Sequence, residues 1–420
     1  MKKRYLAASV LAWCCTALMS AHAADPAMIK ARQKYFGKEN VDPATGELPK
    51  DKVVFSWLSN SSFATSIEGR LIYLDTYVTR LEVQPGRTPV VVQDLVDMKP
   101  EAIFLGHGHS DHADNAAFIA AKTGATIYAT EETCGAMQDD FKRMRTDPLV
   151  QNDARARFAA DAQVRCRNVT STDSTPGTEV IRITALEPAA CVVAFRHLHS
   201  VAVPPDPDFP PTPVRIIVDP RDAALFPAGT SLTPPRSGTP AAGQMNLGTS
   251  GNSGPGGAAA LFFHFVVRDG SNFTFAWHNS AGALKEGRGS GWNGTPEDGR
   301  RLVDLMSSLP YTDVQMGTAS SGNFNNNGLR DLIMYQDALK PKVYIPNHIT
   351  SGTATREASS MSVYAGYLKQ LELMGRPRTE WPDIRWIVDP MDYAVPISFK
   401  TTDKAWEDPR KAERIRSFCN

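Results

Sequence analysis

The sequence predicts a large α/β domain, and two observations support this prediction. Strand-length apolar runs, such as 53–58 and 71–75, alternate with segments whose apolar residues recur at helical spacing. The 420 residues, of which 42% are hydrophobic and 21% charged, suffice for one large domain or two ordinary ones. Lys plus Arg and Asp plus Glu both total 45, so the charge balance does not favour binding to nucleic acid or to an anionic membrane.

The first 23 residues have the pattern of a signal peptide. Lys2, Lys3 and Arg4 precede an apolar run, and residues 21–23 read Ala-His-Ala, a cleavage signal of small residues. The apolar run is too short for a good membrane span, so we expect none in the mature chain, residues 24–420. An uncleaved N-terminal anchor is the alternative. The pattern therefore predicts a periplasmic or secreted protein.

Four cysteines remain after the signal peptide, because Cys14 and Cys15 lie within it. In an exported protein four cysteines predict two disulfides, for which three pairings are possible, and buried free thiols are the alternative. Their spacing does not match a zinc site of the Cys-x-x-Cys type. The four are Cys134, Cys166, Cys191 and Cys419.

Residues 102–129 predict a strand, a loop, a helix over 114–122 and a second strand. The loop carries the most unusual pattern in the chain, since residues 106–112 read Gly-His-Gly-His-Ser-Asp-His. Gly106 and Gly108 are expected to let the backbone turn tightly between the polar side chains.

The second half of the chain is predicted from local signals. Residues 200–258 are rich in Pro, Gly, Ser and Thr and cannot bury much core, so we expect a loop-rich insertion there with one brief strand at 215–219. The other expected elements are strands at 179–186 and 191–196, a hairpin at 261–277, a helix that begins after Thr295 and ends before Pro310, a helix at 328–339, a strand at 342–346 and a late strand at 384–388.

Three histidines and an aspartate lie within six residues of the loop. His107 and His109 are two apart in an extended segment, so their side chains point the same way and can hold one ion. Asp111 and His112 follow on the turn and can serve a second ion. Neutral imidazoles and a carboxylate suit zinc, iron or manganese. The alternative is that Asp111 only caps the following helix and the histidines are polar loop residues.

The motif His-x-His-x-Asp-His after a strand resembles the signature of the metallo-β-lactamase superfamily. The resemblance covers residues 53–350 apart from the insertion, and the layout is most similar to the ascorbate-phosphate-lactonase-like branch. It implies a four-layer αβ/βα sandwich in one domain. The further segments that match the family pattern are the strand pair at 60–75, residues 196–200, residues 273–282 and residues 344–348.

Carried over by position, the resemblance implies two metal ions, expected to be zinc, with iron or manganese as alternatives. The implied ligands are His107, His109 and His199 for the first ion, and Asp111, His112 and His348 for the second. His197 competes with His199 for the same role.

One departure from the family pattern concerns the second ion. Where the family usually has Gly-Asp, this chain has His278 and Asn279. Asparagine is a weaker ligand, so either the second metal is held less firmly, or His278 substitutes, or hydroxide alone bridges. His264, in the middle of an expected strand, is interpreted as a packed histidine of the core.

The resemblance implies a hydrolase in which a metal-bound hydroxide attacks an ester, lactone, amide or phosphodiester. Asp111 is the expected catalytic residue, because it can orient the nucleophile as well as bind metal. No cluster of Arg or Lys lies near the motifs, which disfavours a heavily phosphorylated substrate, and we expect a small molecule rather than nucleic acid. The alternative is an exported metal- or ligand-binding protein that kept the fold and lost turnover, and Asn279 is its main support.

Overall fold

The computed structural model describes residues 25–78, 90–209, 257–319, 328–348, 360–386 and 395–420. Four expectations lie wholly or partly outside these residues: the signal peptide at 1–23, the brief strand at 215–219, most of the insertion at 200–258 and the end of the late strand at 384–388. Within the described ranges, no helix is both long enough and apolar enough to cross a membrane.

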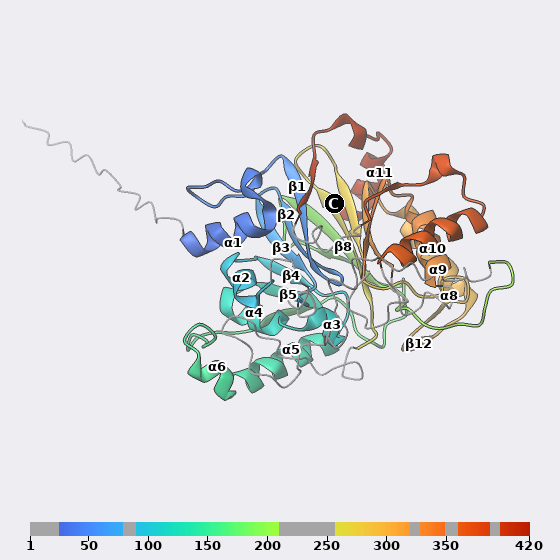
Figure 1. Ribbon diagram of the computed structural model, residues 1–420. Helices are drawn as coiled ribbons and strands as arrows, with labels where there is room; N and C mark the ends of the chain where they lie inside the picture. Colours follow the sequence, from blue (N-terminus) through green and yellow to red (C-terminus); the bar gives the residue numbers. More distant parts are fainter. Residues whose placement is uncertain (1–24, 79–89, 210–256, 320–327, 349–359, 387–394) are drawn as a thin grey trace, which may run out of the picture.

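Two seven-stranded sheets form the centre of the described part of the chain (Figure 1). In the first sheet, the strands from β16 to β3 are antiparallel neighbours and those from β3 to β6 are parallel. Its strands, in spatial order, are β16 (Ile397–Lys400), β1 (Lys52–Ser59), β2 (Ser62–Ile67), β3 (Arg70–Leu74), β4 (Ala102–Phe104), β5 (Thr126–Ala129) and β6 (Arg165–Asn168).

The second sheet repeats this plan, with a parallel half and an antiparallel half. The strands from β15 to β10 are parallel neighbours, and those from β10 to β7 are antiparallel. Its strands, in spatial order, are β15 (Asp383–Ile384), β14 (Val343–Asn347), β13 (Val314–Thr318), β10 (Thr274–Trp277), β9 (Leu261–Val267), β8 (Ala190–Arg196) and β7 (Val180–Ile183).

Helices cover the outer face of each sheet, and the result is four layers (Figure 1). The first sheet packs against α1 (Pro26–Phe36), α2 (Val92–Asp97), α4 (Ala116–Thr123), α5 (Glu131–Met144) and α6 (Pro148–Asn152). The second packs against α8 (Pro296–Ser308), α9 (Gly328–Leu339) and α11 (Lys411–Cys419), and α10 (Ser360–Leu373) lies beside α9. The predicted αβ/βα sandwich is confirmed.

The core between the sheets is rich in aromatic side chains. Phe265 and Phe275 stack with ring centroids 4.4 Å apart, and the edge of Phe55 from the first sheet meets Phe275 with centroids 5.1 Å apart. These rings alternate with outward-facing residues along each strand, as the two-residue period of a strand requires. Full burial of each such side chain stabilises the fold by about 1.5–3 kcal/mol.

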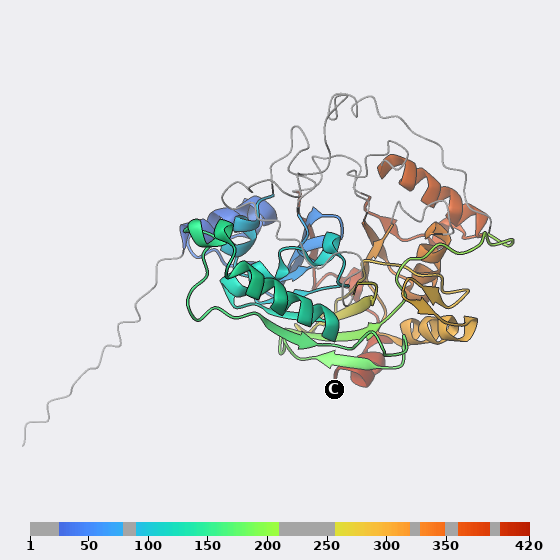
Figure 2. The same ribbon diagram turned by 90° about the horizontal axis from the view of Figure 1, so that it is seen from below.

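The structure has two disulfides, as the four cysteines predict. Cys134 pairs with Cys166, which joins α5 to β6, and Cys191 pairs with Cys419, which joins β8 to the last helix. Figure 2 shows α11, in dark red, beside the green strands of the second sheet. The alternative of buried free thiols is therefore wrong.

Candidate metal centre

The motif loop, residues 106–112, leaves β4 and contacts the second sheet at once. The N–H of Leu261, the first residue of β9, donates to the carbonyl of Gly106 at 2.7 Å. A Cβ on Gly106 would lie 2.2 Å from the amide nitrogen of Asn279. The backbone bends at both Gly106 and Gly108, as expected, although neither residue has a positive φ. Gly106 is needed because the backbone passes so close to Asn279.

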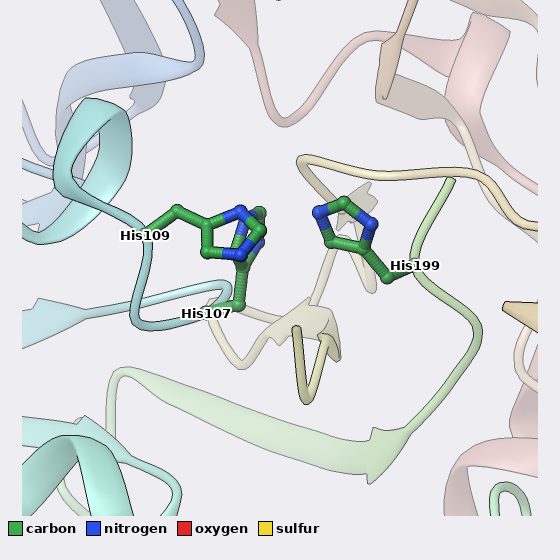
Figure 3. Close-up of side chains that lie close together, drawn as sticks. All are labelled: His107, His109 and His199. Carbon is green, nitrogen blue, oxygen red and sulfur yellow. The ribbon is translucent and has the colours of Figure 1, made fainter. Parts of the chain in front are cut away.

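The first ligand cluster consists of His107, His109 and His199, each offering one ring nitrogen, and these nitrogens all lie within 4.8 Å of one another. Figure 3 shows His107 and His109 on the motif loop and His199 opposite them, on the segment that follows β8. The Nε2 of His107 and the Nδ1 of His109 are 3.0 Å apart. The ring of His199 lies 4.6 Å from that of His107 and 4.9 Å from that of His109, between centroids.

Hydrogen bonds behind this cluster determine which nitrogens are free. The Nδ1 of His107 lies 2.9 Å from the amide oxygen of Asn279, and the Nδ1 of His199 lies 2.8 Å from the carbonyl oxygen of Ser200. Both oxygens are acceptors, so each Nδ1 carries the proton and each Nε2 keeps its lone pair.

Electrostatics keeps the rings of His107 and His199 neutral. Burial, reinforced by His112 and His199, lowers the pKa of His107 well below its usual value. Burial and the neighbouring His109 lower the pKa of His199 to about 3. Neutral imidazole is the form that binds a metal ion.

The second ligand cluster consists of Asp111, His112 and His348, again with ligand atoms within 4.8 Å of one another. The Oδ2 of Asp111 lies 3.5 Å from the Nε2 of His112 and 3.3 Å from the Nε2 of His348. Asp111 is inside the single turn of α3 (Ser110–Ala113), whose N-cap, His109, makes no side-chain capping bond. The interpretation of Asp111 as only a helix cap is therefore wrong.

The second cluster is more polar than the first. Burial alone would raise the pKa of the Asp111 carboxyl, but His112 and His348 outweigh burial and hold that pKa well below its usual range. For His112, burial acts to lower the pKa, yet the carboxylates of Asp111 and Asp75 raise it. The second cluster therefore holds a carboxylate and two imidazoles, where the first holds only imidazoles.

Asp75 supports the site, and the sequence analysis missed it. It directly follows β3 and is fully buried. Its Oδ2 lies 2.7 Å from the Nδ1 of His112 and accepts from the hydroxyl of Ser61 at 2.7 Å and from the amide of Asn279 at 2.8 Å. Its Oδ1 accepts the backbone N–H of Gly106 at 2.9 Å. An acidic residue directly after an apolar strand, next to the strand of the motif, was the available signal.

The remaining candidates lie behind the clusters. His197 faces the hydroxyl of Tyr335 at 3.0 Å, and His278 lies between the carbonyl of Ser280 at 2.7 Å and the amide of Gln315 at 2.8 Å. Neither His197 nor His278 belongs to a ligand cluster formed by the described residues.

Asn279 and His264 also have other partners. The amide of Asn279 is engaged by His107 on its oxygen and by Asp75 on its nitrogen. His264 is fully buried in β9, where its Nε2 lies 3.3 Å from the hydroxyl of Thr312. Asn279 therefore lies behind the histidine rings, and His264 is packed in the core.

The donor set fits metal ions of the zinc type. Two groups of three ligand atoms lie side by side, and the rings of His107 and His112, one from each group, have centroids 4.1 Å apart. Imidazole nitrogen and carboxylate oxygen are ligands that zinc, iron and manganese accept in proteins. The two clusters could therefore each hold an ion.

Comparisons with known proteins give short sequence matches and remote structural ones. No family model matches the chain. It is similar to the exodeoxyribonuclease WalJ of Streptococcus pneumoniae, with 34% identity over 85 residues, 19% of this chain and 32% of the relative. It is also similar to a metal-dependent hydrolase of Pyrobaculum neutrophilum, with 28% identity over 76 residues, 18% of this chain and 32% of the relative. The chain thus spans about a third of the length of these curated relatives.

Among solved structures, the chain is similar to the metallo hydrolase Igni18 of Ignicoccus hospitalis, with a TM-score of 0.44 and 11% identity, over 83% of this chain and 98% of that one. It is also similar to zinc-bound PqqB of Methylobacterium extorquens, with a TM-score of 0.38 and 10% identity, over 83% of this chain and 99% of that one. The assignment of the fold rests on this chain's own strand order, layers and motif. All three agree with the metallo-β-lactamase fold that the sequence resemblance implies.

Proposed function

We propose that the chain is a metal-dependent hydrolase with a two-ion centre at the edge where its sheets meet. The observation that carries the proposal is the pair of adjacent three-residue clusters, each with its ligand atoms within 4.8 Å of one another. In this proposal His107, His109 and His199 hold one ion, and Asp111, His112 and His348 hold the other. When bound, such ions supply Lewis acidity and lower the pKa of water that they contact.

The residues of the chain prepare the site for that chemistry. Asn279, Asp75 and the carbonyl of Ser200 each face the Nδ1 of a histidine ring, which turns Nε2 toward the site. The side chain of Asp111 is 33% exposed. Its carboxylate can therefore reach a substrate and accept a proton from an attacking water as well as bind metal.

The proposed reaction is hydrolysis of an ester, lactone, amide or phosphodiester bond. The resemblance to the ascorbate-phosphate-lactonase-like branch favours a small molecule. The relative WalJ is an exodeoxyribonuclease by name, so a DNA strand belongs among the substrates to be tested. We place the protein outside the cytoplasm, because its start has the signal-peptide pattern and two disulfides are typical of exported proteins.

The central experiment is a hydrolysis screen of the chain loaded with zinc, iron or manganese. The panel contains chromogenic esters, lactones, a β-lactam, phosphodiesters and single-stranded DNA. Hydrolysis of one class by the loaded chain, and loss of that activity on chelation, is the expected result. If the chain binds two ions and hydrolyses nothing in the panel, the alternative of a metal- or ligand-binding protein without turnover is preferred.

Asp111→Ala is the matching variant. It removes a proposed metal ligand and a proton acceptor together, so we expect at least about a 100-fold loss of kcat/KM. Asp139→Ala is the control, because Asp139 is an exposed residue of α5 that pairs with Lys142 on the surface. Equal activity of the two variants would show that Asp111 has no part in the reaction.

Export has its own test. Mass spectrometry of the protein recovered from the periplasm or medium, without reductant, should give a chain that begins near Ala24 and lacks four hydrogens because of its two disulfides. Recovery of the protein from the cytoplasm alone would contradict export. An intact N-terminus would contradict cleavage after residue 23, and four free thiols would contradict the two disulfides.

A further inference from the structure

The turn between β1 and β2, residues 60–61, forms a hydrogen bond with each of the three residues of the second ligand cluster. The side chain of Asn60 reaches Asp111, and its backbone carbonyl reaches His348. Ser61 reaches His112, both directly and through Asp75. These contacts come from two consecutive residues of the first sheet.

The amide of Asn60 is directed at Asp111. Its Nδ2 donates to the backbone carbonyl of Asp111 at 2.8 Å and to the carboxylate Oδ2 at 3.2 Å. The reversed amide would place oxygen against two acceptors, so the orientation is fixed by chemistry. This Oδ2 is the same atom that faces His112 and His348. Asn60 is only 1% exposed, so solvent does not replace the bond.

The backbone of Asn60 joins the two sheets at the site. Its carbonyl accepts the N–H of His348 at 3.0 Å, and His348 belongs to the loop that leaves β14 of the second sheet. The same carbonyl accepts the indole N–H of Trp57 at 2.7 Å. Asn60 has a φ of +51°, a left-handed conformation that asparagine and glycine tolerate best.

The first cluster has different supports. His107 is held by the amide of Asn279, and His199 is held by the carbonyl of Ser200. Asn279 also contacts Asp75 and His112, so it supports both clusters. The hydrogen bonds of Asn60, by contrast, run to Asp111, His348 and Trp57. A change at Asn60 should therefore act on the second cluster.

We propose that Asn60 is a positioning residue for the second metal ion: its amide orients the Asp111 carboxylate and thereby sets the affinity for that ion without affecting the first. The proposal rests on the two-ion centre of the proposed function. It assigns a role to a residue that has no metal-ligating atom in either cluster and that the motif does not contain.

The test is a calorimetric zinc titration of the metal-free chain and of two variants. Asn60→Gly removes the amide, tolerates the positive φ and keeps the carbonyl that accepts from His348. Asn272→Gly is the matched control, because Asn272 also has a positive φ, of 54°, and lies in the turn between β9 and β10. Thermal unfolding of all three metal-free proteins shows whether they are folded alike.

For Asn60→Gly we expect about a 10- to 100-fold loss of affinity for the second zinc ion, the usual effect of removing a partner of a metal ligand. The affinity for the first ion should change by less than about twofold, and Asn272→Gly should match the wild type. The proposal is overturned if Asn60→Gly lowers the affinity for both ions equally, or for neither ion. It is also overturned if the wild-type chain binds one ion only. Because no substrate is involved, a protein that binds two ions and hydrolyses nothing refutes the proposed function and leaves this role for Asn60 intact.

Discussion

The motif loop and the remote ligands His199 and His348 reach the same site by different means. The motif loop supplies four ligand candidates from six consecutive residues, and its own backbone fixes their spacing. His199 and His348 lie on the segments that follow β8 and β14 of the second sheet, and their positions depend on residues far away in the sequence. The comparison shows that four of the six candidate ligands are encoded locally, while the other two depend on tertiary packing.

The position of His199 depends on α9. The hydroxyl of Tyr335 in that helix donates to the carbonyl of Leu198 at 3.4 Å. Leu198 is the residue directly before His199. Seven residues after His199, the carboxylate of Asp206 pairs with Arg330 of the same helix, with a nitrogen–oxygen distance of 2.5 Å. The side chain of Arg330 is fully buried and also pairs with Glu286 and Asp331. The segment that carries His199 is thus attached to α9 on both sides.

The largest effect should come from Arg330→Met, which tests this attachment. The change leaves three carboxylates without their shared cation, two of them buried, so we expect the free energy of unfolding to fall by about 3–5 kcal/mol. Urea denaturation of the metal-free chain measures this loss. The affinity for the first ion should fall as well, because His199 belongs to that cluster.

Arg300→Met is the control for this prediction. Arg300 is exposed on α8, where the same substitution should change the free energy of unfolding by less than about 0.5 kcal/mol. If the two variants were equally stable, Arg330 would not anchor the segment after His199, and the comparison between the local and remote ligands would lose its physical basis.

Elements with strong local signals could be predicted from the sequence. The helix expected after Thr295 is α8, and a capping box between Thr295 and Asp298 defines its start. The expected hairpin is the antiparallel pair β9 and β10. By contrast, α11 was not predicted, because its nine residues are mostly polar and its place depends on tertiary contacts, such as the burial of Ile415 and the Cys191–Cys419 disulfide.

The same distinction applies to the site. Its motif is visible in the sequence because four candidate ligands lie within six residues. Asp75 and Asn60 were missed because Gly106 and Asp111, the motif residues that they contact, are 31 and 51 residues away. The pairing of the cysteines could not be predicted either, since all three pairings agree with the sequence and only the packing of α5 and α11 decides among them.

Asn279→Ala sharpens the comparison with an intermediate effect. Asn279 accepts from His107 of the first cluster and donates to Asp75, which orients His112 of the second. We expect about a 10-fold loss of affinity for both ions in a zinc titration, in contrast to the selective loss for Asn60→Gly. Asn168→Ala, at an exposed position of β6, is the control. A loss restricted to one ion would show that Asn279 supports only one cluster.

The smallest effect is expected for His264→Gln, which separates a histidine of the core from those of the site. His264 is fully buried in β9, and burial together with the charge of Lys411 lowers its pKa to about 3. In the unfolded chain an ordinary histidine has a pKa of about 6.5. At a pH between these two pKa values, His264 is protonated in the unfolded chain and neutral in the folded chain. The stability that neutral His264 contributes is therefore complete above pH 6.5 and is lost as the pH falls.

His264→Gln should remove this pH dependence and leave the metal site intact. At pH 7 we expect the variant to be less stable by about 1 kcal/mol, because a packed side chain is replaced. Between pH 7 and pH 5 the wild type should lose about 2 kcal/mol relative to the variant, since each pKa unit corresponds to about 1.4 kcal/mol. Urea denaturation of the metal-free proteins at both pH values measures the difference, in which the titration of all other histidines cancels.

Zinc affinity at pH 7 should be unchanged because His264 belongs to neither cluster. A constant stability difference across this range would mean that His264 takes up its proton in the folded chain, and it would then not be the neutral, packed histidine that the core of β9 requires.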